Sequence, residues 1–361
     1  MASTSTGRPF DQSRSEAFAE SLLQHLNHAA LCLMASIGHR TGLFDVMRDL
    51  PPSTSPDIAR LANLDERYVR EWLGAMVTAG VIEVDATSTL YSLPPEHAAM
   101  LTRAAGPDNL AMLTQLVGML GSVEDDIVTC FREGGGVPYD RFARFHAVMA
   151  EDEGVVSALE PRVLPLVPGL ADRLSQGIRV LDVGCGSGRA MNRLAARYPN
   201  SQFTGMDLSQ EAILAARSES QAKNLHNVEF IARDLTDFNQ TAESDSYDLI
   251  TTFDAIHDQA RPLNVLEGIH RSLRPDGVYL MQEIKAASQV HGNIGHPLGT
   301  FLYTVSAMHC MTVSLAQGGE GLGAMWGEET TREYLTRAGF RSVEKHELPH
   351  DVMNNWYIVR K

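Results

Sequence analysis

The sequence has few cysteines, few cations and no long apolar runs. Its four cysteines, Cys32, Cys130, Cys185 and Cys310, are scattered with no C-x-x-C pair, which excludes a disulfide framework and predicts reduced thiols, no metal site and a cytoplasmic protein. Thirty Lys and Arg residues face 45 Asp and Glu residues, a net charge of −15, which disfavours nucleic acid as a partner. No apolar run is long enough to span a bilayer, so we expect no membrane partner.

The first third of the chain predicts a small helical domain. Residues 1–15 are polar and are expected to form a disordered lead-in, and residues 16–105 carry helical periodicity and turn signals. Ser55 before Pro56 predicts one helix cap, and Asp65 predicts the cap of a helix over 66–79. Two short β-prone runs, 81–86 and 89–93, then predict a hairpin. Two helices followed by a hairpin indicate a winged helix.

A winged helix has two possible roles. Its second helix can read DNA, or the domain can pack against a second copy of the chain and wall the active site. The helix over 66–79 has Arg67 and Arg70 but also acidic neighbours, and the expected wing from Asp85 has no lysine or arginine. On charge, we favour the dimerisation role and expect a homodimer.

The most informative motif is D-V-G-C-G-S-G, which follows a short apolar run over 178–183. The run predicts a buried parallel strand, and Gly184, Gly186 and Gly188 predict a tight turn that a ligand can approach closely. The third glycine comes one residue too early for a dinucleotide fingerprint, and the Walker pattern is absent. Asp182 and the bare amides of the turn suit a ligand with an amino group and a carboxylate.

Further predicted strands each end in an acid. Asp207 follows the run 202–206 and lies 19 positions after Gly188, the spacing that places a carboxylate on ribose hydroxyls. Asp234 ends the next strand, and Asp254 follows the strand over 247–253. Because ligands bind at the carboxyl ends of strands in open α/β sheets, we expect these acids to share one site.

Together these motifs resemble the class I S-adenosylmethionine methyltransferases, and the stretch Leu273-Arg-Pro-Asp-Gly-Val resembles that family's "LKPGG" segment. The resemblance implies an α/β, Rossmann-like sheet over 169–361, closed by an antiparallel hairpin. It implies S-adenosyl-L-methionine as cofactor and S-adenosyl-L-homocysteine as product. The implied cofactor-binding residues are Asp182, Gly184, Cys185, Gly186, Gly188, Asp207, Leu208, Asp234, Leu235, Phe253 and Asp254. The N-terminal segment resembles the winged-helix domain of small-molecule O-methyltransferases and of bacterial methyltransferases labelled as regulators.

Two other segments are candidates for covering a small-molecule substrate. Residues 106–168 form a predicted helical linker, with Tyr139, Phe142, Phe145 and His146 at helical spacing. Residues 286–327 form a predicted lid insertion with a helix over 300–316. Bulky side chains there, Met308 and Trp326 among them, suit an apolar or aromatic substrate, although core packing alone also accounts for such side chains.

The segment Phe253-Asp-Ala-Ile-His-Asp258 resembles the place where small-molecule O-methyltransferases carry a His-Asp pair with the general base. We therefore expect His257 to remove the proton of a substrate hydroxyl, with Asp254 or Asp258 orienting its ring. Gln259 stands where the family has tryptophan, so nitrogen, sulfur or carbon acceptors remain alternatives. A cofactor-binding transcriptional regulator that acts through the winged helix is a further alternative.

Overall fold

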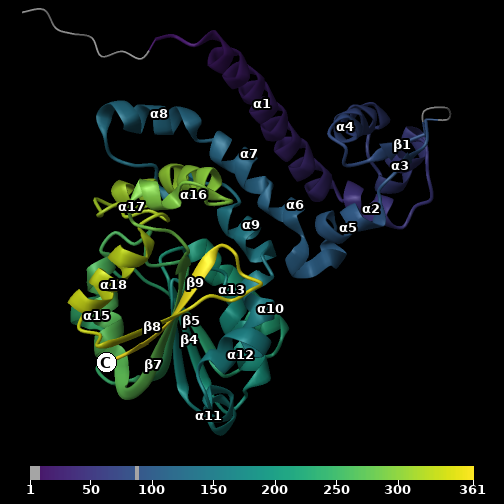
Figure 1. Ribbon diagram of the computed structural model, residues 1–361. Helices are drawn as coiled ribbons and strands as arrows, with labels where there is room; N and C mark the ends of the chain where they lie inside the picture. Colours follow the sequence, from purple (N-terminus) through teal and green to yellow (C-terminus); the bar gives the residue numbers. More distant parts are fainter. Residues whose placement is uncertain (1–8, 86–88) are drawn as a thin grey trace, which may run out of the picture. The chain divides into compact units, whose positions relative to one another are not determined.

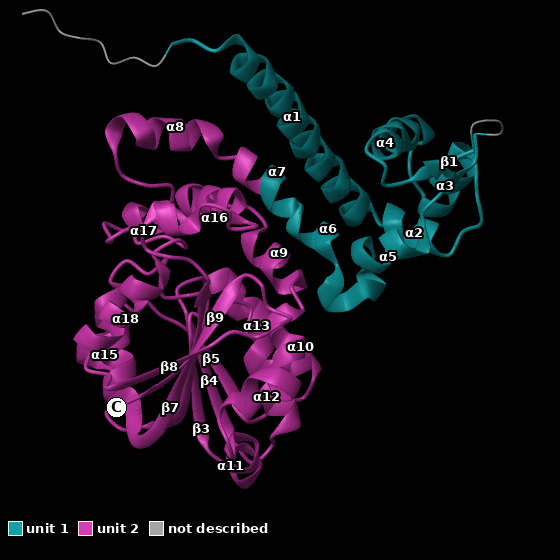
Figure 2. Ribbon diagram, in the orientation of Figure 1, with its two compact units in different colours: residues 1–118 teal, residues 119–361 magenta. Residues whose placement is uncertain are grey.

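The computed structural model describes residues 9–85 and 89–361. Residues 1–8 of the expected lead-in and 86–88 of the expected wing therefore lie outside the described residues. The chain divides into two compact units, Met1–Gly118 and Met119–Lys361, coloured separately in Figure 2. The boundary falls inside the predicted linker 106–168, so that segment is shared between the two units.

The N-terminal unit is helical with one small hairpin. Its elements are α1 (Gln12–Thr41), α2 (Leu43–Arg48), α3 (Ser55–Ala62), α4 (Glu66–Thr78), β1 (Glu83–Val84), β2 (Tyr91–Ser92), α5 (Pro95–Leu101), the 3₁₀ helix η1 (Arg103–Asp108) and α6 (Leu110–Leu113). The two strands pair antiparallel after α3 and α4, as the winged-helix prediction requires. Trp72 of α4 packs edge-on against Phe44, with ring centroids 5.3 Å apart, in the core of this unit.

Two helix starts differ from the prediction. Helix α1 begins at Gln12, because the Asp11 carboxylate accepts a hydrogen bond from the Arg14 amide, so residues 12–15 of the expected lead-in are helical. Thr54, not Ser55, caps α3. The Ser55 hydroxyl instead donates to Glu66 Oε1 at 2.6 Å and links α3 to the start of α4. Asp65 caps α4 as predicted.

The C-terminal unit is built on a seven-stranded mixed sheet (Figure 1) with the order β5-β4-β3-β6-β7-β9-β8. The strands are β3 (Arg179–Val183), β4 (Gln202–Asp207), β5 (Val228–Ala232), β6 (Tyr247–Phe253), β7 (Leu273–Ile284), β8 (Ser342–His346) and β9 (Asn354–Arg360). Strands β3 to β7 are parallel, and β9 pairs antiparallel with both β7 and β8. The predicted parallel sheet with a closing antiparallel hairpin is confirmed.

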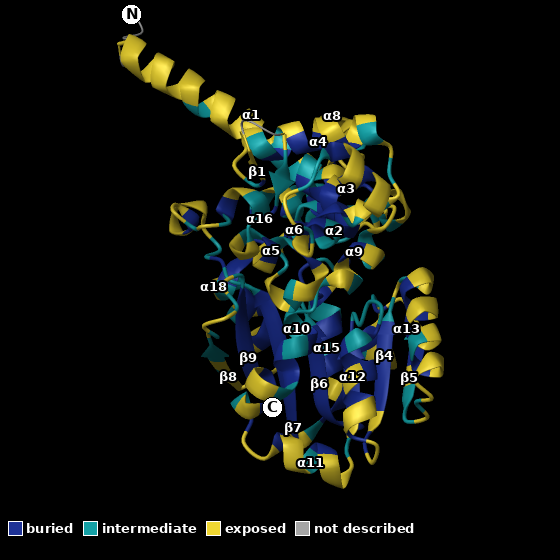
Figure 3. Ribbon diagram, turned by 90° about the vertical axis from the view of Figure 1, so that its right-hand side faces the viewer, coloured by how far each residue is buried: buried dark blue, intermediate teal, exposed yellow. Residues whose placement is uncertain are grey.

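Helices cover both faces of this sheet (Figure 1). The bounds are α11 (Leu170–Gln176), α12 (Arg189–Arg197), α13 (Gln210–Ala222), α14 (Phe238–Thr241), α15 (Pro262–Ser272) and α18 (Gly327–Arg337). Neighbouring residues of β3 face opposite ways: Val180 packs in the core under α11 to α13, and Leu181 packs in the core under α14, α15 and α18. Burial on both faces explains why the inner strands are largely apolar and dark blue in Figure 3, whereas the edge strands β5 and β8 are more exposed.

The segment before the sheet is more broken than predicted. It contains α7 (Gln115–Gly121), α8 (Glu124–Glu133), the 3₁₀ helix η2 (Tyr139–Arg141), α9 (Phe145–Glu151), α10 (Gly154–Ala158), the π turn η3 (Leu159–Val163) and the 3₁₀ helix η4 (Leu164–Leu166). The predicted helical linker over 106–168 is split into short helices, and the Thr114 and Ser122 hydroxyls donate to backbone carbonyls at two of the breaks. The expected helical stripe from Tyr139 is interrupted at Arg144, whose φ is +73°.

The insertion after β7 contains the predicted lid helix. It comprises the 3₁₀ helix η5 (Val290–Asn293), α16 (Gly299–Val305), the π turn η6 (Ser306–Cys310) and α17 (Met311–Ala316). The last three elements follow one another without a gap and cover the predicted helix over 300–316. The π turn within it was not predicted.

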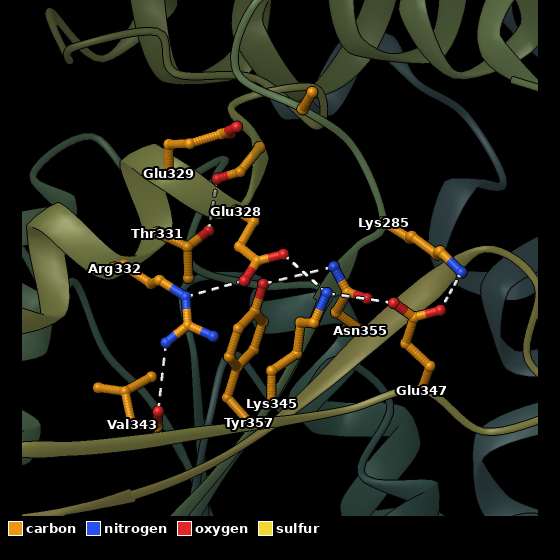
Figure 4. A network of polar contacts seen from close by, with 12 residues as sticks. Lys285, Glu328, Glu329, Thr331, Arg332, Val343, Lys345, Glu347, Asn355 and Tyr357 are labelled. Atoms are coloured by element: carbon orange, nitrogen blue, oxygen red, sulfur yellow. Dashed lines mark hydrogen bonds and ion pairs between the residues drawn. The ribbon is translucent and has the colours of Figure 1, made fainter. Parts of the chain in front are cut away.

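A polar network attaches the start of α18 to the closing hairpin (Figure 4). Glu328 accepts hydrogen bonds from Arg332 Nε and Lys345 Nζ, both at 2.8 Å. Arg332 also donates to the Val343 carbonyl, and Lys345 to Glu347. These contacts hold α18 on β8. Because the C-terminal end of the lid leads directly into α18, they hold that end of the lid as well.

Candidate functional site

The glycine turn after β3 lies beside the end of β4, as the motif predicts. The Gly184 and Cys185 amides donate to the Met206 carbonyl at 2.8 and 3.0 Å. The Gly186 amide donates to Asp207 Oδ2 at 2.8 Å, and the Ser209 amide donates to Asp207 Oδ1 at 2.8 Å. A carboxylate accepts about four hydrogen bonds, so Asp207 retains capacity for hydroxyl donors.

The three glycines of the turn have different surroundings. All have positive φ, at +73°, +52° and +67° for Gly184, Gly186 and Gly188. A Cβ at Gly184 would lie 2.5 Å from Ala255 Cβ, and a Cβ at Gly188 would lie 2.4 Å from the Phe230 ring. At Gly186, by contrast, no heavy atom of the described residues other than its chain neighbours lies within 4 Å of that position. The turn thus presents bare backbone at Gly186.

Asp182 lies deeper than the motif suggests. Its side chain is 1% exposed and accepts a hydrogen bond from Thr251 Oγ1 of β6 at 2.7 Å. Burial raises the pKa of this carboxyl to about 7. Asp182 therefore sits within the sheet rather than in the turn.

The end of β5 brings its predicted residues to the same edge. The Arg233 amide donates to the Asp207 carbonyl at 2.8 Å, which places Asp234 near the end of β4. Asp234 is exposed and accepts from the Thr236 amide at 2.9 Å. Leu235 is 4% exposed and Leu208 is 46% exposed, so these two apolar candidates have opposite surroundings.

The end of β6 holds Phe253 and a strained acid. Asp254 has φ +49°, an uncommon conformation for a residue with a side chain. Its Oδ2 accepts from Gln282 Nε2 at 3.2 Å, but its buried Oδ1 has no hydrogen-bond partner among the described residues. Burial and the nearby Glu283 raise the pKa of Asp254 well above its usual value. The Phe253 ring packs edge-on against Trp356, with centroids 6.1 Å apart.

His257 forms a buried pair with Glu283 at the end of β7. The ring is 3% exposed, the carboxylate is fully buried, and Nδ1 lies 2.6 Å from Glu283 Oε2. Burial alone lowers the pKa of His257, but the Glu283 carboxylate and the adjacent Cys310 thiol raise it well above its usual value. The Glu283 carboxylate thus holds Nδ1, and the Cys310 thiol is a further hydrogen-bond partner of the His257 ring.

Glu283 is not among the residues that the sequence predicts for this site, where Asp254 or Asp258 is expected to orient the ring. Its Oε1 accepts from the Ile256 amide at 3.2 Å, and its Oε2 also accepts from Trp326 Nε1 at 3.1 Å. Trp326, expected at the substrate, thus braces this carboxylate. The sequence does carry a signal for Glu283, because it is a glutamate at the end of the apolar run of β7. The carboxyl ends of the parallel strands meet at this edge of the sheet.

Asp258 bonds an aromatic side chain rather than the histidine. The Tyr139 hydroxyl donates to Asp258 Oδ2 at 2.6 Å. Burial raises the pKa of Asp258 to about 6, and burial and this carboxylate raise the pKa of Tyr139 well above its usual value. The Tyr139 ring stacks on His146 at 6.1 Å and meets Phe145 edge-on at 6.4 Å, so three of the predicted substrate residues do gather here.

The lid helix adds a histidine to this group. His309 lies in the π turn and packs against Tyr139, Phe142 and Phe145, with ring centroids 5.4, 4.8 and 3.8 Å away. Met308, the neighbouring residue that the sequence predicts at the substrate, is half-buried. We call Tyr139, Phe142, Phe145, His146 and His309 the aromatic cluster.

The lid is bonded to the loop that carries His257. The Gly323 amide donates to the His257 carbonyl at 3.1 Å, and the Ser314 hydroxyl donates to the Gln259 carbonyl at 2.9 Å. A Cβ at Gly319 would lie 2.6 Å from Ala260 Cα, and one at Gly136 would lie 2.0 Å from the Thr312 carbonyl oxygen. Both glycines therefore permit backbone contact between lid and site.

Across residues 9–85 and 89–361, no group of three or more His, Cys, Asp or Glu side chains is arranged to hold a metal ion. In the same part of the chain, no helix combines the length and apolar character needed to cross a membrane.

Comparisons with known proteins agree with this geometry. Residues 29–103 match the family model of the Rv2258c-like winged HTH domain, and residues 174–331 match the model of a methyltransferase domain. The chain therefore contains a winged HTH domain and a methyltransferase domain. The resemblance predicted from the motifs is confirmed.

Curated relatives match only part of the chain. It is 29% identical over 151 residues to a ubiquinone biosynthesis O-methyltransferase of Actinobacillus pleuropneumoniae, covering 40% of this chain and 63% of that protein. It is 27% identical over 206 residues to a malonyl-[acyl-carrier protein] O-methyltransferase of Geobacter sulfurreducens, covering 54% of this chain and 68% of that protein. The chain thus spans less than two thirds of the length of the first of these relatives.

Solved structures match the whole chain in fold. The mitomycin 7-O-methyltransferase MmcR aligns with a TM-score of 0.71 at 17% identity, over 97% of this chain and 100% of that one. Human N-acetylserotonin methyltransferase, in complex with SAM, aligns with a TM-score of 0.69 at 20% identity, over 99% of each chain. At these identities the likeness establishes the fold, that of class I methyltransferases with an N-terminal winged helix.

Replacing Glu283 by glutamine should lower the pKa of His257, because the carboxylate that favours the charged ring is lost. A histidine-ring NMR titration of wild type and Glu283→Gln measures this shift. Glu344→Gln, on β8, is the control and should leave the titration of His257 unchanged. An unaltered His257 titration in Glu283→Gln would contradict the assigned pair.

Proposed function

We propose that this protein transfers a methyl group from S-adenosyl-L-methionine to a hydroxyl of a small apolar or aromatic molecule, with His257 as general base. The observation that carries the proposal is the buried His257–Glu283 pair, 2.6 Å apart, at the strand edge that also holds the glycine turn. A base whose second nitrogen is held by a carboxylate is suited to accept a proton from a hydroxyl.

The residues at this edge fit the cofactor. Gly186 offers open backbone, and Asp207 has lone pairs left for a ribose diol. Asp234 and Leu235 follow the next strand and suit the adenine ring. The unpartnered Oδ1 of Asp254 is a buried acceptor that a positively charged group would satisfy. We assign cofactor contacts to these residues and to Gly184, Cys185, Gly188, Leu208 and Phe253, and treat Asp182 as a support for the turn.

The cofactor supplies a methyl group on a sulfonium, an activated carbon with a neutral leaving group. The chain's own residues align the nucleophile and remove its proton. His257 Nε2 accepts that proton, and Glu283 holds the ring by Nδ1 and stabilises the imidazolium that forms. Trp326 and the Ile256 amide hold Glu283 in turn. Asp258, bonded to Tyr139, positions the aromatic cluster rather than the base.

The aromatic cluster supports a flat, apolar acceptor, because rings stack on rings. Nitrogen, sulfur and carbon acceptors are the alternatives, and they need less help from a base. A regulator that reads DNA through α4 is less well supported. Its two arginines are paired within the helix, Arg67 with Glu71 at 2.5 Å and Arg70 with Glu66 at 3.3 Å.

We further propose a cytoplasmic homodimer. All four cysteines are free thiols, as in a reducing compartment. Along α1, large apolar side chains are exposed at helical spacing: Phe18, Leu22, Leu26, Leu33 and Ile37, at 69%, 55%, 66%, 46% and 44%. We call this set the α1 stripe. A second copy of the chain presents the same stripe, and a two-fold axis brings matching stripes together.

Arginine at Gly186 should abolish cofactor binding, because its side chain enters the space beside the turn. Calorimetry with S-adenosyl-L-methionine or S-adenosyl-L-homocysteine measures the loss. Gly80→Arg is the matched control, since Gly80 also has positive φ, +73°, and open surroundings within the described part of the chain. It should bind the cofactor like wild type. Wild-type affinity in Gly186→Arg would overturn the cofactor assignment.

Alanine at His257 should lower turnover by about 10²–10⁴-fold with little change in cofactor affinity, since proton removal is lost and the glycine turn is untouched. Methyl transfer to a panel of phenols, followed by mass spectrometry, measures the effect. His270→Ala on α15, where His270 packs against Phe340, should leave turnover unchanged. An unchanged rate of phenol methylation in His257→Ala would remove His257 as the proposed base.

Glutamate at both Leu22 and Leu26 should convert the dimer to a monomer, because two charges would be buried in the paired α1 stripe. Light scattering after size-exclusion chromatography measures the mass. Gln24→Glu, on another face of α1, is the control and should remain dimeric. A monomeric wild type, or a dimeric double variant, would refute the proposed interface.

A further inference from the structure

The lid helix contains one irregular turn, and that turn faces the site. The π turn Ser306–Cys310 lies between α16 and α17. Single π turns inside α-helices frequently occur at functional sites. Two consecutive residues of this turn have different neighbours: Cys310 lies against the His257 ring, and His309 packs in the aromatic cluster. His309 is therefore held close to the base by the chain itself.

The imidazole of His309 is buried without polar contacts. The residue is 1% exposed, and neither ring nitrogen has a hydrogen-bond partner among the residues that the structure describes. Burial, and repulsion from His257 and His146 when those rings are protonated, lower the pKa of His309 to about 3. At neutral pH the ring is uncharged, so it offers one N–H donor and one nitrogen acceptor.

Packing alone does not account for an imidazole at this position. The ring stacks on Phe145 with an interplanar angle of 16° and meets Tyr139 and Phe142 edge-on. A phenyl ring would make these contacts without burying two unpaired nitrogens, which is unfavourable. His296, in the same insertion, shows the usual arrangement: its Nε2 lies 3.0 Å from the Lys285 carbonyl, and its Nδ1 lies 3.1 Å from the Leu298 amide.

We propose that His309 determines acceptor specificity by hydrogen-bonding a second polar group of the substrate. The substrate class is then a planar aromatic hydroxyl compound with a further hydroxyl or carbonyl oxygen. The hydroxyl that is methylated lies at His257, and the second oxygen takes the place of the missing partner of His309. The rings of Tyr139, Phe142 and Phe145 contact the aromatic plane of the substrate, which lies between its two oxygens. This inference rests on the function proposed above and adds the second recognition point.

The test compares His309→Phe with wild type on naphthol, which has one oxygen, and on the dihydroxynaphthalenes, which have two. We expect His309→Phe to lower kcat/KM for a dihydroxynaphthalene by about tenfold, the effect of one hydrogen bond. The value for naphthol and the affinity for S-adenosyl-L-methionine should not change. His309→Gln, which keeps a donor and an acceptor, should recover part of the loss.

Thermal unfolding gives a readout that needs no acceptor. His309→Phe should raise Tm, because two unpaired buried nitrogens are removed, whereas His296→Phe should lower Tm, because two partnered nitrogens are lost. A fall in Tm for His309→Phe would show that its nitrogens are already satisfied and would overturn the inference. An equal kcat/KM ratio for the two acceptors in wild type and His309→Phe would also overturn it while leaving the proposed function intact. Turnover that survives His257→Ala would instead remove the proposed base.

Discussion

The hydrogen bond between Glu283 and His257 joins two strand ends that are distant in sequence, and much of the site depends on it. Glu283 lies near the end of β7, and His257 lies in the loop after β6, with 26 positions between them. A fully buried carboxylate is unfavourable unless it is paired and hydrogen-bonded. The His257 ring, the Ile256 amide and the Trp326 indole together satisfy this one. The same contacts determine where the His257 ring lies relative to the glycine turn.

The fold was largely predictable because its strands are buried on both faces. Such strands appear as short apolar runs, and the runs predicted over 178–183, 202–206 and 247–253 are strands β3, β4 and β6 of the sheet. The glycine turn and Asp207 were predictable because their spacing along the chain reflects a local βαβ geometry. Asp65 was found as a helix cap for the same reason, since a cap interacts with amides two or three residues away.

Other features depend on contacts between distant segments, which a single sequence does not encode in its spacing. The sequence favours Asp254 and Asp258 because those acids are close to His257 along the chain, whereas the pairing of β6 with β7 brings Glu283 to the ring. Tyr139 and His309 meet from segments 170 positions apart. The π turn has no residue signature, and the breaks in the helical linker at Thr114 and Ser122 reflect hydroxyl groups competing for backbone carbonyls.

The close contacts at Gly136 and Gly319 bear on how acceptor preference can be altered by exchanging the lid with a relative. Gly136 touches the backbone of α17, and Gly319 touches the loop after His257. A segment from a relative that replaces residues 286–327 must therefore approach residue 136 and Ala260 with its backbone, with no side chain in between. A graft limited to α16 and α17 would leave out Gly136 and Gly319, the two glycines at which the lid and the neighbouring backbone make contact. The natural unit of exchange is the insertion together with the short glycine stretch 134–136.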